Sequence, residues 1–271
     1  MIPNISIHSH TSRGHADNTA EEMILSAIDM GCPAIGFSEH SYIDEYNWWT
    51  LERGTEMDYV REILALKEKY KGKIDVFLGL EQDCRSPMYE YDKYDYVIGS
   101  IHAIPYEDGT FSIDETREHF IAQTNARFGG DFYKVCEDYY DLMCNIVEIT
   151  KCDIIGHFDI VTKFNEPEIL DIEHPRYKAA YMKALDALCK KDVIFEVNTG
   201  AISRGHRTSP YPSKPILKEM CRRGCKIIVT SDTHNKDTIL CWFDKADGYL
   251  KDCGYKSVLV KTRDGFKEVN I

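Results

Sequence analysis

The chain has 271 residues, 43% of them hydrophobic and 29% charged, with a formal net charge of −12 at pH 7. No apolar run approaches the ~18 residues that a membrane-spanning helix needs, and the acidic balance lacks the basic footprint of nucleic-acid-binding proteins. We therefore expect neither a membrane nor a nucleic acid as partner. Because α/β barrels of roughly 250 residues commonly fold as one unit, we expect a single domain over residues 1–271.

The N-terminal residues and the cysteines indicate a cytoplasmic protein. Met1-Ile2-Pro3-Asn4 has neither the basic region nor the apolar region of a secretory signal. The ten cysteines are scattered without a repeated spacing, which favours reduced thiols over a disulfide framework. Cys221 and Cys225 form the closest pair, and since no second pair has zinc-ribbon spacing we interpret them as packing residues.

Short β-branched or aromatic runs alternate with longer segments of helical period, which is typical of βα units around a parallel sheet. The expected strands cover residues 5–8, 34–38, 76–80, 96–100, 154–157, 193–198 and 226–230, with 257–260 as an eighth. The first expected helix begins at the capping box Thr19-Ala20-Glu21-Glu22 and ends at Gly31. The other expected helices cover residues 55–71, 114–128, 131–151, 174–191, 213–224 and 236–252.

Histidines and carboxylates gather at the C-terminal ends of the expected strands. In an α/β barrel these ends converge on one face, where active sites are built. A single histidine at a strand end is compatible with a hydrogen-bonded core residue, but the repetition along one chain favours a shared site. The residues concerned are His8, His10, Glu39, His40, Glu81, His102, His157, Asp232 and His234.

Two pairs of these side chains are separated by a single residue. His8 and His10 follow the first expected strand, and Asp232 and His234 follow the strand 226–230. Because alternate residues of an extended chain point to the same side, both members of a pair can reach one metal ion. Alternatives stay open for each pair: the histidines alone are compatible with a polar loop, and Asp232 is compatible with a helix cap.

The ligand types predict a catalytic site for two or three divalent ions. Glu81 has two oxygens that can bridge two cations, and carboxylate with imidazole suits zinc, manganese or iron(II). The candidate ligands are His8, His10, His15, His40, Glu81, His102, His157, Asp232 and His234. With neutral histidines, three divalent ions less two carboxylates leave roughly +4. This charge suits a small phosphorylated substrate better than a nucleic acid.

The same residues occur in motifs that resemble those of the PHP family, named for its polymerase-associated and histidinol phosphatase members. In chain order the motifs read HSH, GH at 14–15, FSEH, LGLEQD, GSIHA, IGHFDI and SDTH. The resemblance implies an α/β fold, a distorted barrel of seven βα units, with a trinuclear metal centre at the C-terminal ends of the strands. Many members begin the first motif with an acidic residue, where this chain has Ser6-Ile7, so a contact outside the ligands is expected to differ.

The resemblance also implies how the ligands are shared. The first ion would be held by His8, His10, Glu81 and Asp232. Glu81 would bridge to a second ion, held by His102 and His157. The third ion would be held by His15, His40 and His234.

Residues 196–213, EVNTGAISRGHRTSPYPS, resemble a segment of monofunctional histidinol phosphatases that follows the sixth strand. A basic residue of that segment binds the substrate phosphate, and Arg204 is the best match, with Arg207 as a second candidate. Lys163 follows IGHFDI, where those enzymes often place another basic residue, although a solvated surface lysine fits equally well. His206 is close enough to these arginines in sequence to touch the substrate.

The resemblance implies an enzyme of histidine biosynthesis that hydrolyses L-histidinol phosphate to L-histidinol and phosphate. Glu81 would bridge the ions, and Arg204 would offset charge on the phosphoryl group. Either Asp232 or a nearby histidine would supply the leaving-group proton. Trp48 and Trp49 either cover the imidazole of this substrate or pack in the core. Two other functions stay open: a PHP phosphoesterase for another small phosphate or nucleotide, and a metal-binding module without catalysis.

Overall fold

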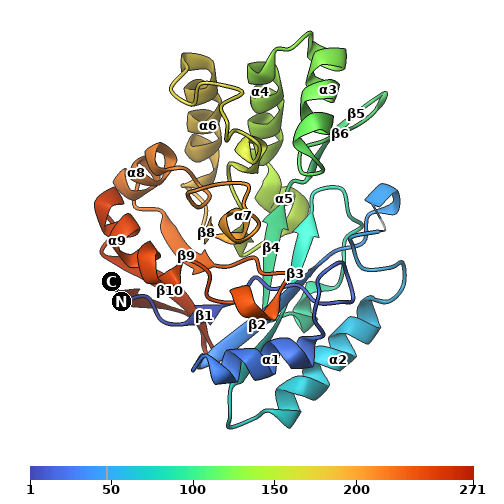
Figure 1. Ribbon diagram of the computed structural model, residues 1–271, viewed down its shortest axis with the longest axis vertical. Coiled ribbons are helices and arrows are strands. Elements are labelled where there is room, and N and C mark those ends of the chain that lie inside the picture. Colours follow the sequence, from blue (N-terminus) through green and yellow to red (C-terminus); the bar gives the residue numbers. More distant parts are fainter. Residues whose placement is uncertain (47) are drawn as a thin grey trace.

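A curled sheet lies at the centre of the protein (Figure 1), in a computed structural model that describes residues 1–46 and 48–271. Neighbouring strands of the sheet are parallel except for the last pair, which is antiparallel. Within the described residues, the strands in spatial order are β1 (Ile5–Ser6), β2 (Ala34–His40), β3 (Asp75–Asp83), β4 (Tyr96–Ser100), β7 (Ile154–Ile155), β8 (Ile194–Asn198), β9 (Lys226–Thr230), β10 (Ser257–Thr262) and β11 (Gly265–Asn270).

The strand at one end of this sheet, β1, meets β9 at Ser9 and Thr233, which form an isolated parallel bridge. The main-chain N–H of His10 donates to the carbonyl of Thr233 at 2.9 Å, and the N–H of Thr233 donates to the carbonyl of His8 at 3.2 Å. This bridge closes the strands from β1 to β9 into a distorted barrel, with β10 and β11 outside the ring. The predicted α/β fold, a distorted barrel of seven strands, is confirmed.

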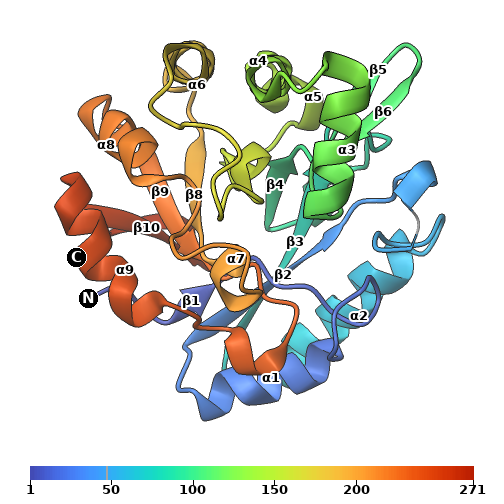
Figure 2. The same cartoon turned by 45° about the horizontal axis from the view of Figure 1, so that its top comes forward.

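Helices surround the sheet, as Figure 2 shows, while α7 lies near the centre of both views. The helices of the described residues are α1 (Ala20–Asp29), α2 (Glu56–Lys69), α3 (Arg117–Phe128), α4 (Phe132–Met143), α5 (Ile146–Thr150), α6 (Pro175–Leu188), α7 (Gly200–Ser203), α8 (Lys214–Arg222) and α9 (Phe243–Cys253). The predicted capping box is confirmed, because Thr19 and Glu22 each accept a hydrogen bond from the main-chain N–H of the other. None of these helices is both long and apolar enough to cross a membrane.

Two predicted helices are wrong in extent. The expected helix 131–151 is divided into α4 and α5 at Asn145, whose φ of −111° and ψ of 6° interrupt the helical backbone. Asparagine favours such breaks because its side chain competes for main-chain hydrogen bonds. The expected helix 236–252 begins only at Phe243, because Trp242 before it adopts a left-handed φ of 66° that a right-handed helix cannot include.

A hairpin of β5 (Ala103–Tyr106) and β6 (Gly109–Ser112) was not predicted. It directly follows His102, and the chain then passes through Asp114 before α3 begins. In consequence this inserted hairpin brings an acidic segment to the mouth of the barrel.

Apolar side chains fill the barrel below the strand ends, among them Ile7, Phe77, Tyr96 and Ile98. The Tyr96 ring occupies the space that a side chain at Gly79 would need, since a Cβ there would lie 2.2 Å from the ring carbon Cζ. The Tyr96 hydroxyl contacts the main-chain carbonyls of Ile7, directly after β1, and of Phe37 in β2, and neither of these strands adjoins β4 in the sheet. With the interior filled in this way, polar side chains at the strand ends face only the open C-terminal end.

The expectation of reduced thiols is wrong for one pair. Cys189, at the end of α6, forms a disulfide with Cys225, which directly precedes β9, and their Cα atoms are 5.8 Å apart. The spacing along the sequence could not reveal this pair, because the two residues are 36 positions apart and meet only through the packing of α6 against the sheet edge. The other cysteines of the described chain are free.

Candidate metal centre

Glu81, the seventh residue of β3, lies among histidines from neighbouring strands. Its Oε2 is 2.6 Å from Nδ1 of His40, 3.3 Å from Nε2 of His8 and 3.6 Å from Nε2 of His10. The register of parallel pairing explains part of this arrangement, because His40 of β2 lies directly beside Glu81 of β3. One carboxylate oxygen is thus within reach of three imidazoles.

The other oxygen of Glu81 faces the opposite side of the barrel mouth. Its Oε1 is 3.0 Å from Nε2 of His157 and 3.5 Å from Nε2 of His102, and Ser100 donates a hydrogen bond to it at 2.6 Å. The two oxygens therefore address different sets of histidines, as a carboxylate that bridges two cations must.

Several polar atoms at this point are buried and lack a hydrogen-bond partner. They include Nε2 of His8 and both ring nitrogens of His10. Leaving such atoms unpaired costs about 1–3 kcal/mol each, so the folded chain needs something to satisfy them. A divalent cation does so, because it accepts lone pairs from imidazole and carboxylate together. The residues present therefore fit bound metal ions.

Asp232 completes the floor of the site from the loop after β9. Its Oδ1 is 3.2 Å from Nε2 of His10 and 3.6 Å from Nε2 of His8, while Oδ2 accepts a hydrogen bond from Asn198 at 3.2 Å. The carboxylate is directed toward the histidines, and the next α-helix, α9, begins only at Phe243. The alternative of a helix cap is therefore not what the structure shows.

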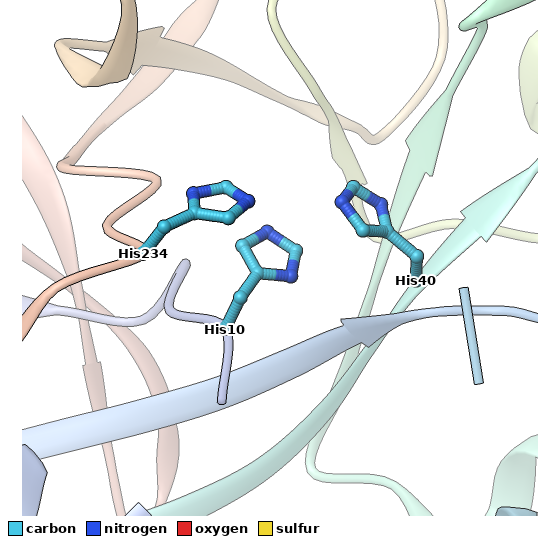
Figure 3. Close-up of side chains that lie close together, drawn as sticks. All are labelled: His10, His40 and His234. Carbon is cyan, nitrogen blue, oxygen red and sulfur yellow. The ribbon is translucent and has the colours of Figure 1, made fainter. Parts of the chain in front are cut away.

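Among the described residues, three groups of side chains have ligand atoms close enough together to hold a metal ion. The groups are His8, His10 and Asp232; His40, Glu81 and His102; and His10, His40 and His234. Figure 3 shows the last group, with its imidazole rings facing a common space. The rings of His10 and His234 stack with centroids 4.3 Å apart, and those of His10 and His40 with centroids 4.1 Å apart.

His15 and His157 stand outside these three groups but lie next to them. The ring of His15 is 4.4 Å from the ring of His234 between centroids and 5.3 Å from that of His40, while its Nδ1 is 3.0 Å from the carbonyl oxygen of Trp49. His157 reaches the site through Oε1 of Glu81. The structure thus brings all nine candidate ligands to one face, although it places His10 rather than His15 between His40 and His234.

Glu196 supports this face from β8 and was not predicted to take part. Its Oε1 is 2.5 Å from Nδ1 of His8 and accepts a hydrogen bond from Thr230 at 2.7 Å, while Oε2 accepts one from the main-chain N–H of His157 at 2.8 Å. A carboxylate on the far ring nitrogen fixes the tautomer of a ligand histidine. A signal was present in the sequence, since an acidic residue interrupts the apolar strand Ile194–Asn198.

Asp83 and Glu39 act in a similar way on two other histidines. Oδ2 of Asp83 is 3.0 Å from both Nδ1 and the main-chain nitrogen of His102. Oε1 of Glu39 accepts a hydrogen bond from the N–H of Thr11 at 2.6 Å, and its Oε2 is 3.8 Å from Nδ1 of His10. Buried acidic groups thus surround the ligand histidines on their outer side.

The electrostatic surroundings keep the central carboxylates ionised. Burial favours a raised pKa for Glu81, but the adjacent His40, His8 and His102 hold it well below its usual value. Burial opposes ionisation of Asp232 as well, and Arg204 together with His8 holds the pKa of Asp232 well below its usual range. Ionised carboxylates are the form that binds metal ions.

A cavity of about 220 Å³ opens above these side chains, and Arg204 is the cation at its floor. Arg204 follows α7, and its Nη1 donates to the carbonyl of Asp232 at 2.8 Å, while Nη2 is 3.1 Å from Oδ2 of the same residue. Nη1 is also 3.0 Å from Nδ1 of His234. A guanidinium at this place can donate to an anion bound beside the candidate ligands.

The other predicted substrate residues divide into two sets. Lys163, Trp48 and Trp49 line the cavity, whereas its described lining includes neither Arg207 nor His206. Arg207 is buried elsewhere: its Nη1 donates to Oγ1 of Thr162 at 2.8 Å and lies 3.7 Å from Oδ1 of Asp159. Its guanidinium covers the ring of Tyr211 at 4.5 Å, and His206 packs edge-on against Phe164. Neither Arg207 nor His206 therefore belongs to the described lining of the cavity.

A family model of the PHP domain matches residues 5–200, which is more than half of the chain. The chain belongs to the PHP domain family. The residues that match the family model include the candidate ligands from His8 to His157. Asp232 and His234 lie beyond the matched range.

Relatives of this PHP protein extend over nearly the whole chain. A Deinococcus radiodurans protein named probable histidinol-phosphatase is 28% identical over 266 residues, covering 94% of this chain and 96% of the relative. A Listeria monocytogenes structure has a TM-score of 0.76 at 20% identity and covers 89% of this chain and 99% of its own. A Lactococcus lactis histidinol phosphate phosphatase, complexed with zinc, L-histidinol and phosphate, has a TM-score of 0.68 at 20% identity and covers 98% of this chain and 100% of its own.

Proposed function

We propose that this PHP protein is a metal-dependent phosphomonoesterase that hydrolyses L-histidinol phosphate to L-histidinol and inorganic phosphate, in histidine biosynthesis. The observation that carries the proposal is the cavity itself, where Arg204 and Lys163 stand over the cluster of nine candidate ligands. The names of its relatives support this substrate. The proposal includes a cytoplasmic location and one functional domain over residues 1–271.

The proposed metal ligands follow the predicted division. His8, His10, Glu81 and Asp232 would hold one ion, and Glu81 would bridge to a second ion with His102 and His157. His15, His40 and His234 would hold a third. Zinc, manganese and iron(II) all suit this mixture of imidazole and carboxylate.

Divalent ions held there supply positive charge for the phosphate oxygens and lower the pKa of water to about 7, which makes it a nucleophile at neutral pH. The chain's own residues bind and orient the substrate. Arg204 donates through its guanidinium to the phosphoryl oxygens and offsets charge that develops on them. Lys163 offers a second cation on the cavity wall. The leaving alkoxide also needs a proton, and a histidine of the cavity is the proposed source, because Arg204 and His8 keep the carboxylate of Asp232 ionised.

A comparison of substrates tests the proposal. The purified protein, loaded with zinc or manganese, should release phosphate from L-histidinol phosphate with a kcat/KM at least about 100-fold above that for p-nitrophenyl phosphate. Equal rates on both would contradict the substrate assignment and favour a PHP phosphoesterase for another small phosphate or nucleotide. Bound metal without phosphatase activity on any member of the panel would favour the non-catalytic module.

Metal analysis tests the ligand assignment independently of activity. The change Glu81→Ala removes the proposed bridge, so the variant should bind fewer ions per chain by elemental analysis than the unaltered protein. Glu118→Gln provides a matched control, because Glu118 is exposed in the first turn of α3. Full metal content in the Glu81→Ala variant would show that Glu81 does not bridge.

A further inference from the structure

The cavity has an acidic side that the proposed hydrolysis does not use. Asp114 and Glu115, between β6 and α3, line it together with Trp48 and Trp49. A site that only binds phosphate gains nothing from carboxylates, because they repel the anion. The acidic side therefore points to a second feature of the ligand.

Asp114 forms an ion pair with Lys163 across the cavity wall. The ammonium of Lys163 contacts Oδ1 of Asp114 and also donates to the main-chain carbonyl of Asp114 at 3.2 Å. The Lys163 side chain is only 10% exposed and that of Asp114 is 30% exposed, so water does little to replace either partner. The pair therefore places a positive and a negative charge side by side in the wall of the cavity.

The position of Glu115 is different. It is exposed at the rim, and its Oε2 is 2.6 Å from Nδ1 of His119, outside the cavity. Asp114 is the more enclosed of the two carboxylates and the nearer to the cationic floor, since Arg204 and His102 both act on its charge. Of the two, Asp114 is the one placed to contact a bound substrate.

Binding of a phosphate monoester would change the charge that Lys163 contacts. A phosphate at the floor attracts Lys163, and Asp114 would then lose the partner that satisfies its charge. A partly buried carboxylate without a partner is unfavourable, so the substrate that binds best is one that brings its own cation to Asp114. A neutral or anionic substituent at the same place would leave the carboxylate unpaired.

We propose that Asp114 binds an ammonium group of the substrate, in exchange for Lys163, so that the cavity selects phosphate monoesters of amino alcohols. The inference rests on the proposed function for the phosphate itself and adds the group that distinguishes this substrate class from other small phosphates. Lys163 and Asp114 then each pair with one charge of the substrate.

Kinetics on two matched substrates test this inference. The pair is L-histidinol phosphate and its analogue without the amino group, which keeps the imidazole and the phosphate. Asp114→Asn should raise KM for L-histidinol phosphate about tenfold or more and leave the analogue nearly unchanged, because only the former loses a charge-assisted hydrogen bond. Lys163→Met should weaken both substrates together, and Glu118→Gln should change neither. If Asp114→Asn weakens both substrates equally, Asp114 serves only to hold Lys163, and the inference is overturned.

Folding and the proposed function are checked separately. Thermal unfolding and metal content of the Asp114→Asn variant should match those of the unaltered protein. If that unaltered protein prefers generic phosphomonoesters to L-histidinol phosphate, the proposed function fails, and the same comparison is made with O-phosphoethanolamine and ethyl phosphate. A preference for the amine that Asp114→Asn abolishes supports the inference even then, whereas no preference in the unaltered protein overturns it.

Discussion

Oε1 of Glu196 lies 2.5 Å from Nδ1 of His8, and both side chains are fully buried. Because the carboxylate accepts the Nδ1 proton, the lone pair of Nε2 is directed to the face that Glu81 and Asp232 share. The same carboxylate binds the main-chain N–H of His157 through its other oxygen. A single side chain on β8 therefore connects two candidate ligands from different strands.

We expect Glu196→Ala to weaken zinc binding by about 10–100-fold, since an unrestrained His8 ring must be ordered again at each binding event. Competition with a chromogenic chelator measures this affinity directly. Glu196→Gln serves as the conservative variant, because its carbonyl oxygen still accepts the Nδ1 proton and should retain most of the affinity. Unchanged zinc affinity in the alanine variant would contradict the role.

The two arginines of the segment after β8 should respond differently to substitution. Arg204→Met should lower kcat/KM by about 100-fold with full metal content, because it removes a donor from the cavity floor. Arg207→Met should instead lower the free energy of unfolding by about 3 kcal/mol, since Asp159 loses its buried cation. Phosphate release and urea unfolding measure the two effects. The opposite pattern would show that Arg207, the second candidate of the sequence motif, is the arginine that binds the phosphate.

Acid stability should depend on Glu219 in α8. Hydrogen bonds from Arg222 and then Arg223 lower the pKa of Glu219 to about 2. Because the folded pKa lies below the unfolded value of ~4.3, the stabilisation is complete above that value and disappears as the pH falls toward 2. Glu219→Gln should therefore cost about 1 kcal/mol near pH 6 after solvent screening and almost nothing near pH 2. Urea unfolding across this range measures the difference, and a pH-independent cost would refute the assignment.

Reduction of the disulfide between Cys189 and Cys225 should lower stability without changing the site. Opening a cross-link over 36 positions increases the entropy of the unfolded chain and costs about 3–4 kcal/mol. Unfolding with and without dithiothreitol measures this cost. A Cys144→Ser variant should respond to dithiothreitol like the unaltered protein, because Cys144 is free. A stability that dithiothreitol leaves unchanged would argue that the bond adds nothing.

The sequence predicted the barrel because its strands are short apolar runs, and the candidate ligands because they follow those runs directly. What it could not predict depends on packing between distant segments. The contact of Glu196 with His8 and the pair of Asp114 with Lys163 join residues whose separation carries no local signal. The sequence could not show that Arg207, the second candidate for phosphate binding, lies beside Asp159, because the two residues are distant in the chain.

The contact between the segments of β1 and β9 has a consequence for the synthesis of the protein. Ser6 and Ser231, which form a hydrogen bond between these segments, are 225 positions apart in the chain. His8 and His10 therefore leave the ribosome long before Asp232 and His234 exist to face them. A nascent or prematurely terminated polypeptide that ends before β9 exposes several histidines without the carboxylate that completes their group. The group of His8, His10 and Asp232 is thus complete only in a chain that extends past β9, whereas His40, Glu81 and His102 all precede that strand.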